Sequence, residues 1–407
     1  MTARILASTG VPVRQSSVRA HNLALVLRTV ADGTYPLSRA ATAAITGLTR
    51  ATVSALVDDL IAGGLLTEVE PAPRTGAGRP AAGLTLAPHG PAGLGLEINV
   101  DYLAACLVDL GGTVRHRIVE HADQRPAGAA GALAGLAALA RRVLAETAGL
   151  PVAGAALAVP GLVGADGVVR VAPNLGWQDV DAAAVLRAEL GLAVSVDNEA
   201  NLAALSELRL AGTRDFVYVS GEIGIGAGIV LDGTLYRGVR GWSGEIGHLT
   251  VRPDGPPCRC GGRGCLEKYA GQEAILRAAG VDSLDRLDPA AGTALEAAGS
   301  ALGIVLAGVI NLLDVDTVVL GGSYGPLLPG LRGGIEAELH SRVLTADLAP
   351  ITLRAAALGA DAAMRGAADS VIRAVQRDPA GYLSGTGRLS GTGRLSGTGR
   401  LSGTGRA

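Results

Sequence analysis

Aromatic residues and lysine are scarce in this sequence of 407 residues: aromatics make up 2%, and Lys268 is the only lysine. A core must therefore be built from alanine, leucine and valine, and a hydrophobic content of 48% is enough for two or three domains. Because nearly every basic residue is an arginine, a single arginine says little about function. The N-terminus shows no apolar segment of the length that a secretory signal peptide needs.

Long uncharged runs are also rare. The longest covers residues 297–313, is shorter than a membrane span usually needs, and contains Ser300 and Asn311. We interpret it as a buried helix. Together with the missing signal peptide, this predicts a soluble, cytoplasmic protein without membrane segments.

The chain has only four cysteines, and three of them, Cys258, Cys260 and Cys265, lie in one glycine-rich stretch. A disulfide framework would spread its cysteines along the chain, so the cluster indicates a metal site in a reducing compartment. His248, which nine residues separate from Cys258, supplies a fourth donor, and Zn²⁺ prefers such a closed Cys₃His set in structural sites. The alternative is three free thiols that are close by chance. Cys106 lies in an apolar run and is expected in the core.

Charge is unevenly distributed along the chain. Residues 1–90 hold eight arginines and five acidic residues, a net charge of +3, whereas the whole chain carries -2 at pH 7. The remainder is therefore acidic, with a net charge of -5. A basic N-terminal part on an acidic body favours contact with nucleic acid by the N-terminal part alone.

Three helices are predicted near the N-terminus. The first covers residues 19–31, where apolar residues recur at helical spacing. Ser38 is expected to cap a second helix that runs to Gly47, and Thr49 to cap a third over residues 50–62. The apolar residues of this third helix form one stripe, as on a face buried against its neighbours.

Two short strands are predicted after these helices, at residues 65–69 and 82–86, on either side of a tip rich in proline, glycine and arginine at 71–80. Three helices followed by a hairpin are typical of a winged helix-turn-helix. We assign this domain to residues 18–88, preceded by a flexible leader at 1–17.

The start of the third helix is the part that enters the major groove in a helix-turn-helix. Arg50, Thr52 and Ser54 lie there, largely off the buried stripe, and are predicted to contact DNA. Arg79, at the tip of the hairpin, could enter a minor groove. The alternative for the tip is an exposed, flexible loop without a role in binding.

A different pattern begins near residue 93, where sets of strands followed by helices occur twice. The predicted strands are 95–100, 104–109, 114–120, 153–159, 194–196, 216–220, 226–231 and 317–321. The duplication predicts a two-lobed α/β domain over residues 89–380, split near 212, with a cleft between the lobes. Residues 381–407, which contain four copies of Leu-Ser-Gly-Thr-Gly-Arg, are predicted to be a disordered tail.

The stretch Gly-Glu-Ile-Gly-His at 244–248 and the cysteine loop up to Glu267 resemble the signature of the ROK family, which groups sugar kinases with sugar-responsive repressors. Three further stretches fit this resemblance: Pro-Asn-Leu-Gly-Trp at 173–177, Asp-Asn-Glu-Ala-Asn at 197–201 and Leu-Gly-Gly at 320–322. The resemblance covers roughly residues 20–375 and implies an α/β, actin-like (RNase H-like), two-lobed sugar-kinase fold. The N-terminal domain resembles that of the repressor branch.

The resemblance also implies a sugar site. Its predicted residues are Gly161, Asn174, Asn198, Glu199, Glu245, His248 and Glu267. Carboxylate, amide and imidazole groups suit sugar hydroxyls, and leaving one polar partner unpaired costs roughly 1–3 kcal/mol. A zinc ion beside His248 would orient its ring and hold the loop that carries Glu267. The alternative is that Glu245 and Glu267 are solvated surface acids.

Two departures from the kinase pattern concern catalysis. Kinases of the family carry Asp-x-Gly-Gly-Thr, whereas the matching stretch at 97–101 is Glu-Ile-Asn-Val-Asp, with side chains where phosphate would approach glycine backbone. Glu199 occupies the position of the kinase general base, an aspartate, and is longer by one methylene. A glycine-rich stretch at 220–228 lacks the following helix of a dinucleotide site, and its Glu222 would repel phosphate.

These observations predict a sugar-responsive transcriptional regulator, a repressor of carbohydrate uptake or catabolism genes, without catalytic residues. It would act as a homodimer or dimer of dimers on a palindromic operator, with a structural zinc ion and a sugar as effector. The main alternative is an ATP-dependent sugar kinase with a regulatory DNA-binding domain. Another is a regulator controlled by a protein partner.

Overall fold

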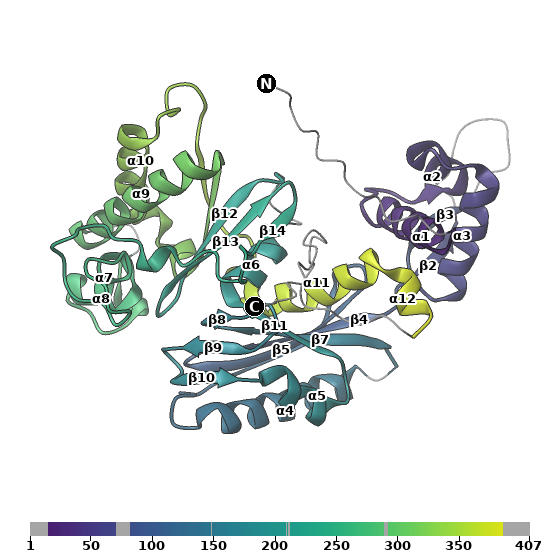
Figure 1. Cartoon of the computed structure of the whole chain (residues 1–407), viewed down its shortest axis with the longest axis horizontal. Helices are drawn as coiled ribbons and strands as arrows, with labels where there is room; N and C mark the ends of the chain where they lie inside the picture. Colours follow the sequence, from purple (N-terminus) through teal and green to yellow (C-terminus); the bar gives the residue numbers. More distant parts are fainter. Residues whose placement is uncertain are drawn as a thin grey trace, which may run out of the picture.

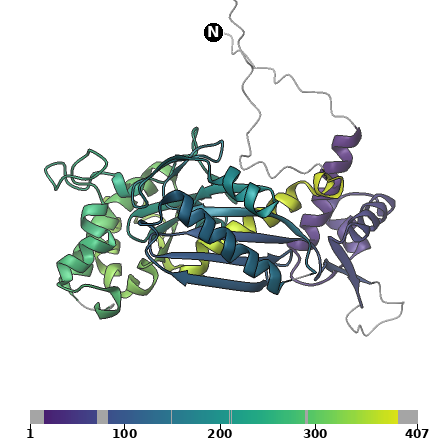
Figure 2. The same ribbon diagram turned by 90° about the horizontal axis from the view of Figure 1, so that it is seen from below.

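The computed structural model describes residues 15–70, 82–147, 149–208, 210, 212–288 and 292–385. Figure 1 shows a small N-terminal domain, the head, at one end of a larger two-lobed body. The same arrangement is seen from below in Figure 2. Most of the predicted leader, the hairpin tip and most of the predicted tail lie outside the described residues.

Three helices build the head: α1 (Gln15–Ala31), α2 (Arg39–Thr46) and α3 (Arg50–Ala62). Both predicted caps are confirmed, because the Ser38 and Thr49 side chains accept backbone amides at the starts of α2 and α3. Gly47 ends α2 with a φ of 72°. The short turn bends α2 against α3 by 116°, the geometry of a helix-turn-helix.

The first helix is longer than predicted. It begins at Gln15, so the last residues of the segment predicted to be a flexible leader are helical, and that boundary was wrong. Nothing in the sequence Gln-Ser-Ser opposes a helix, and burial of Leu23 and Leu27 farther along stabilises the turns before them.

A three-stranded antiparallel sheet completes the head, in the order β1-β3-β2. Its strands are β1 (Leu37–Ser38), β2 (Leu66–Val69) and β3 (Gly83–Leu86). The two predicted hairpin strands are confirmed, each one residue shorter at its start. β1 was not predicted from the sequence, because a strand of two residues has no periodicity of its own.

The first lobe of the body has a five-stranded sheet in the order β11-β7-β4-β5-β6. The strands are β4 (Ala92–Ile98), β5 (Tyr102–Asp109), β6 (Val114–His121), β7 (Val152–Val159) and β11 (Val194–Asn198). β4, β5 and β6 pair antiparallel, whereas β7 runs parallel to β4 and β11 parallel to β7. α4 (Gly128–Glu146) and α5 (Ala182–Leu190) pack against this lobe, and a small sheet of β8 (Leu162–Val163), β9 (Val169–Ala172) and β10 (Trp177–Val180) precedes α5.

The second lobe repeats this topology. Its sheet has the order β14-β13-β12-β15-β16, again with three antiparallel strands followed by two parallel ones. The strands are β12 (Phe216–Gly221), β13 (Ile225–Leu231), β14 (Thr234–Tyr236), β15 (Thr317–Gly322) and β16 (Thr352–Ala355). The helices of this lobe are α7 (Glu267–Ala270), α8 (Gln272–Ala279), α9 (Thr293–Leu313) and α10 (Tyr324–Arg342). The predicted duplication and two-lobed α/β fold are therefore confirmed.

Within the described residues, two helices, α4 and α9, are by length and composition apolar enough to cross a membrane, and the bent pair of α2 and α3 would count as a third. In the structure α9 lies in the core of the second lobe, where Leu302 and Leu306 are fully buried. α4 covers the first sheet with Leu133 and Leu136. The prediction that residues 297–313 form a buried helix is confirmed.

The described chain ends with α11 (Ala362–Arg377) and α12 (Pro379–Leu383). α11 packs on the first sheet and on α6 (Glu199–Glu207), and its last turns enter the core of the head. α12 packs on α1, and the Leu383 side chain lies against Gly63 at the end of α3. Residues 381–383 are thus helical, and the predicted start of the disordered tail was wrong because Tyr382 and Leu383 find apolar surface on the head.

Candidate functional site

The predicted metal ligands come together in the structure. The donor atoms of His248, Cys258, Cys260 and Cys265 all lie within 4.8 Å of one another. Cys258 Sγ is 3.8 Å from His248 Nδ1, and Cys260 Sγ is 3.6 Å from Cys265 Sγ. Four donors at the tetrahedral bond lengths of zinc, about 2.0–2.3 Å, would be about 3.5–3.8 Å apart. The spacing therefore fits a metal ion held by all four side chains.

Backbone contacts shape the loop that carries these ligands. The Cys258 amide donates to the carbonyl of Gly262 at 2.9 Å, and isolated β-bridges pair Thr250 with Cys265 and Pro257 with Arg263. Gly264 has a φ of 64°, and a Cβ there would lie 1.6 Å from the Arg252 carbonyl oxygen. Only glycine fits at this position, so the backbone of the cysteine loop requires this one of its glycines.

A pocket between the lobes, called here the main pocket, adjoins the metal loop. All seven residues predicted for a sugar site line it: Gly161, Asn174, Asn198, Glu199, Glu245, His248 and Glu267. The pocket is also lined by residues that were not predicted to bind: Asn99, Glu222, Ile223 and Arg259. Asn99 and Glu222 had been considered only because they differ from the kinase pattern. Arg259 gave no signal, because nearly every basic residue of this chain is an arginine.

Asn198 ties several elements of the main pocket together. Its Oδ1 accepts the amide of Ala200 at 2.8 Å and so caps α6, and its Nδ2 donates to the Gly161 carbonyl at 3.0 Å. Most of its hydrogen-bonding capacity is therefore used within the protein. Asn198 positions the start of α6 as well as lining the pocket.

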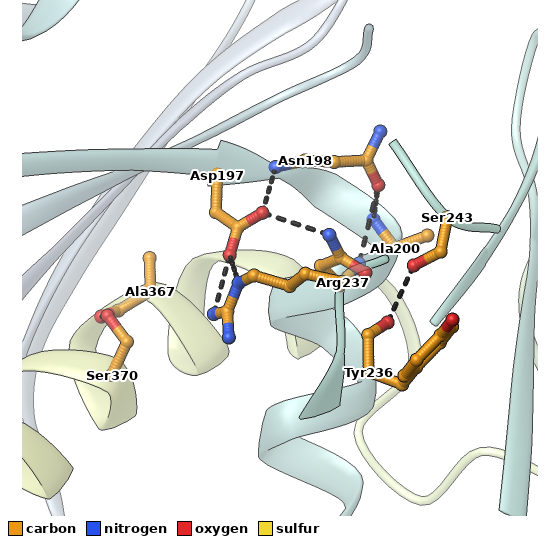
Figure 3. A network of polar contacts seen from close by, with 9 residues as sticks. Asp197, Asn198, Ala200, Tyr236, Arg237, Ser243, Ala367 and Ser370 are labelled. Atoms are coloured by element: carbon orange, nitrogen blue, oxygen red, sulfur yellow. Dashed lines mark hydrogen bonds and ion pairs between the residues drawn. The ribbon is translucent and has the colours of Figure 1, made fainter. Parts of the chain in front are cut away.

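An ion pair beside Asn198 joins the two lobes (Figure 3). Asp197, at the end of β11, accepts from Arg237, which follows β14 in the second lobe, at 2.7 Å. Asp197 also accepts from Asn201 of α6 at 2.9 Å. The start of α6 is therefore linked both to the pocket and to the opposite lobe.

Three carboxyl groups line a second, smaller space, called here the carboxyl cavity: Glu97 of β4, Glu199 of α6 and Glu222 after β12. The Tyr102 hydroxyl donates to Glu97 at 2.6 Å. Burial, reinforced by the charge of Glu222, raises the pKa of Glu97 to about 8. Burial also raises the pKa of Glu222 to about 7 and holds that of Glu199 well above its usual value.

The main pocket is acidic as well. Burial raises the pKa of Glu245, with the nearby His248 opposing this shift and the charge of Glu267 adding to it. Paired carboxyls with amide and imidazole neighbours can donate to and accept from hydroxyl groups. A carboxyl group that is ionised repels phosphate, whereas either form can bond to a hydroxyl, so the arrangement suits a neutral, hydroxyl-rich molecule better than a triphosphate.

The glycine-rich stretch at 220–228 is a hairpin. β12 ends at Gly221 and β13 begins at Ile225, and the two strands pair antiparallel with Ser220 opposite Gly226. The prediction that this stretch is not a dinucleotide fingerprint is confirmed, because a strand follows it in place of a helix.

The residues predicted to contact DNA differ in their surroundings. Arg50, the first residue of α3, is exposed. Thr52 is partly buried and its hydroxyl shares a hydrogen bond of 2.8 Å with Thr49. Ser54 is partly buried beside Arg39, which donates to its carbonyl. Arg79 lies outside the described residues.

Comparisons with known proteins support the family assignment. The model of the ROK family matches residues 93–374. The xylose repressor of Bacillus spizizenii is 30% identical over 345 residues, which cover 81% of this chain and 89% of that protein.

Solved structures agree with the sequence relatives. A ROK family transcriptional regulator, a homologue of the E. coli MLC protein, superimposes with a TM-score of 0.75 at 26% identity and covers 92% of this chain and 99% of its own. A ROK family glucokinase from Streptomyces griseus, in complex with glucose and AMPPNP, has a TM-score of 0.61 at 26% identity and covers 68% of this chain and 98% of its own. The regulator matches the head as well as the body, whereas the kinase matches a share of the chain comparable to the body alone. The chain belongs to the ROK family.

Proposed function

We propose that this chain is a sugar-responsive transcriptional repressor of carbohydrate uptake or catabolism genes. The observation that carries the proposal is the combination, in one chain, of a head with helix-turn-helix geometry and a pocket of hydroxyl-binding groups beside a Cys₃His cluster. The similarity to a xylose repressor and to a ROK transcriptional regulator over most of the chain supports it.

The head is the DNA-binding part of this proposal. It is a winged helix-turn-helix whose α3 enters the major groove, with the exposed Arg50 at its first turn. The basic net charge of residues 1–90 favours the same surface. Two heads in a homodimer, or more in a dimer of dimers, would grip the half-sites of a palindromic operator. The protein would then work in the cytoplasm, on the nucleoid.

The main pocket is the effector site of this proposal. Glu245, Glu267 and Asn174 offer acceptors and donors for sugar hydroxyls, and Arg259 lies at the same pocket. The carboxyl groups disfavour a phosphorylated sugar. We therefore expect a free, neutral monosaccharide.

Zinc is the metal that best fits the four ligands, because three thiolates and one imidazole form the closed tetrahedral set of structural zinc sites. When bound, the ion supplies no reaction but fixes the loop and the His248 ring. With Nδ1 turned to the cysteines, Nε2 of His248 is left to donate to a hydroxyl in the main pocket.

The competing function is an ATP-dependent sugar kinase, favoured by the similarity to a glucokinase and by Glu199 at the general-base position. The carboxyl cavity argues against it, because Glu97 and Glu222 place acidic side chains where a kinase of this family needs room for phosphate. A coupled ADP-release assay over hexoses, pentoses and amino sugars separates the two functions. Turnover that Glu199→Gln abolishes would favour the kinase.

A gel-shift assay tests the repressor directly. The full chain is incubated with the DNA immediately upstream of its own gene, and D-xylose, D-glucose and a panel of other monosaccharides are added singly. We expect a complex that one sugar weakens by about 5- to 150-fold in affinity, the usual range of allosteric coupling. Failure of every sugar to weaken a specific complex would contradict the proposal.

A further inference from the structure

The main pocket and the head are far apart in sequence, but one helix, α11, contacts the elements that lead from one to the other. Its first residues, Ala362 and Ala363, line the carboxyl cavity next to the main pocket. Near its end, Ile372 and Val375 belong to the hydrophobic core of the head. Thirteen residues separate Ala362 from Val375, and at 1.5 Å per residue the helix spans about 20 Å between them.

The pocket end of this connection runs through α6. The Asn198 side chain caps α6 and also holds the carbonyl of Gly161 in the main pocket. Any shift of the pocket wall at Asn198 on binding a ligand must therefore move the start of α6. On its other side α6 contacts β13 of the second lobe, where a Cβ on Gly228 would lie 2.4 Å from Ala204 Cβ.

The contact between α6 and α11 is close. A Cβ on Gly366 would lie 1.7 Å from the carbonyl oxygen of Leu202, so the two helix backbones touch. α11 is equally close to the first sheet, because a Cβ on Gly95 would lie 2.1 Å from the Met364 carbonyl oxygen. A displacement of α6 cannot be absorbed here by side-chain rotation, since there are no side chains between the backbones.

The two halves of α11 pack differently. The first half turns mostly small residues toward the body, Ala362, Ala363, Gly366, Ala367 and Ala368, with Met364 as a bulky apolar side chain packed against the first sheet. The second half inserts Ile372 and Val375 among apolar side chains of the head, including Leu23 and Leu27. Packed helices can slide past one another by small amounts. The helix can therefore shift against the body while it stays fixed to the head.

A group of arginines lies at the same junction. Arg377 ends α11, and its burial, together with the positive charges of Arg237 and Arg28, lowers its pKa. Arg28 belongs to α1 of the head, and Arg237 pairs with Asp197 beside the main pocket. Figure 3 draws this pair together with Ala367 and Ser370 of α11. A change in the Asp197 pair therefore alters the charge that faces the end of α11.

We propose that α11 is the element through which occupation of the main pocket changes the placement of the head, an inference that rests on the proposed repressor function. Binding of a sugar moves α6, α6 displaces α11 along the first sheet, and the head follows because the end of α11 is part of its core. A competing route exists at the turn after β5, where Leu110 also enters the head core. On this proposal, the contacts between α11 and the head determine whether sugar releases DNA, and the contacts of Leu110 with the head do not.

A matched pair of substitutions tests this assignment. Val375 of α11 and Val30 of α1 are the same residue type, are 4% and 6% exposed and belong to the same core. V375A and V30A should therefore lower the free energy of unfolding by similar amounts. Only V375A should reduce the factor by which sugar weakens DNA binding, by about 2- to 30-fold, the range seen for residues on a coupling route. Sugar affinity should stay unchanged in both, and L110A should keep the wild-type factor.

The assay uses the full chain and the DNA immediately upstream of its own gene. The sugar is whichever of D-xylose, D-glucose or the other monosaccharides of the panel releases the wild type from this DNA. If none of the sugars releases DNA from the wild type, the proposed function itself is contradicted. The role of α11 is overturned if sugar releases DNA from the wild type and weakens DNA binding by the same factor in V375A. It is also overturned if this factor is lost in L110A, or is reduced equally in V30A and V375A. These outcomes leave the proposed repressor function intact. If V375A does not fold, hydrogen exchange of the wild type decides. Sugar should then change the protection of amides in α11 and α1, and unchanged protection in α11 overturns the proposal.

Discussion

The main pocket and the carboxyl cavity share Glu199 and Glu222 but differ in what they offer a ligand. The main pocket presents amide, imidazole and carboxyl groups next to a metal-binding loop. The carboxyl cavity is lined by carboxyls whose pKa values are raised because the groups are buried. The proposed function interprets this difference as a kinase fold that keeps the recognition of hydroxyl groups and loses the space for phosphate.

The largest effect is expected from the metal loop. Cys265→Ser replaces a buried ligand, so the protein should lose one zinc ion per chain and several kcal/mol of unfolding free energy, because metal binding contributes directly to folding. Metal analysis and thermal denaturation measure both. Cys106→Ala, outside the loop, should leave the zinc content unchanged. Full retention of metal in the Cys265 variant would show that the cluster does not bind it.

The carboxyl cavity predicts a pH dependence of stability. Glu97 has a pKa of about 8 in the folded protein against 4.5 for an ordinary glutamate. Unfolding releases its proton between these values, so the stability contribution present at low pH is lost as the pH rises toward 8. From pH 6 to pH 8 we expect a loss of about 2 kcal/mol, because the slope of about 1.4 kcal/mol per pH unit flattens as Glu97 begins to ionise in the folded state near pH 8.

Urea denaturation at both pH values measures this loss. Glu97→Gln keeps the shape and the acceptor for Tyr102 but cannot ionise, so its stability should fall less over this range. Glu146→Gln, at an exposed position on α4, should follow the wild type. A wild type whose stability is level from pH 6 to pH 8 would mean that Glu97 is not protonated in the folded state.

The main pocket should respond to single polar substitutions. Glu267→Ala removes a hydrogen-bonding partner from the pocket, so sugar affinity should fall by about 1–3 kcal/mol. Calorimetry with the sugar that releases DNA measures it, and Glu273→Ala, exposed on α8, is the control. Equal affinities in the two variants would place the sugar elsewhere.

The smallest effect is expected in the head. Arg50→Ala removes an exposed cation from the start of α3 and should weaken DNA binding by about 1 kcal/mol, with sugar affinity unchanged. Fluorescence anisotropy with upstream DNA measures the loss. Arg141→Ala, an exposed position on α4, serves as the control. The same loss of DNA affinity in both variants would mean that Arg50 contributes only through the overall positive charge of the protein.

Local signals in the sequence predicted much of the fold. The caps at Ser38 and Thr49 and the bounds of α3 follow from side chains that act within one turn, and they were predicted correctly. The convergence of the four metal ligands was predicted as well, because three of them are constrained by one short loop.

Features that depend on distant contacts were missed or misplaced. α12 forms only because Tyr382 and Leu383 meet the head, and a repeat rich in glycine gives no helical signal. The partial burial of Ser54 depends on Arg39, fifteen residues away. The raised pKa of Glu97 depends first on its burial and then on the charge of Glu222 in the other lobe, neither of which a local pattern reveals.

The central claim is that sugar recognition remains and phosphoryl transfer is lost. Calorimetry on one zinc-loaded preparation tests it most directly, with the monosaccharide panel titrated first and MgATP second, in the presence and absence of the best sugar. We predict saturable binding of one free monosaccharide and no heat from MgATP in either state. Tight MgATP binding without any sugar ligand would contradict the account.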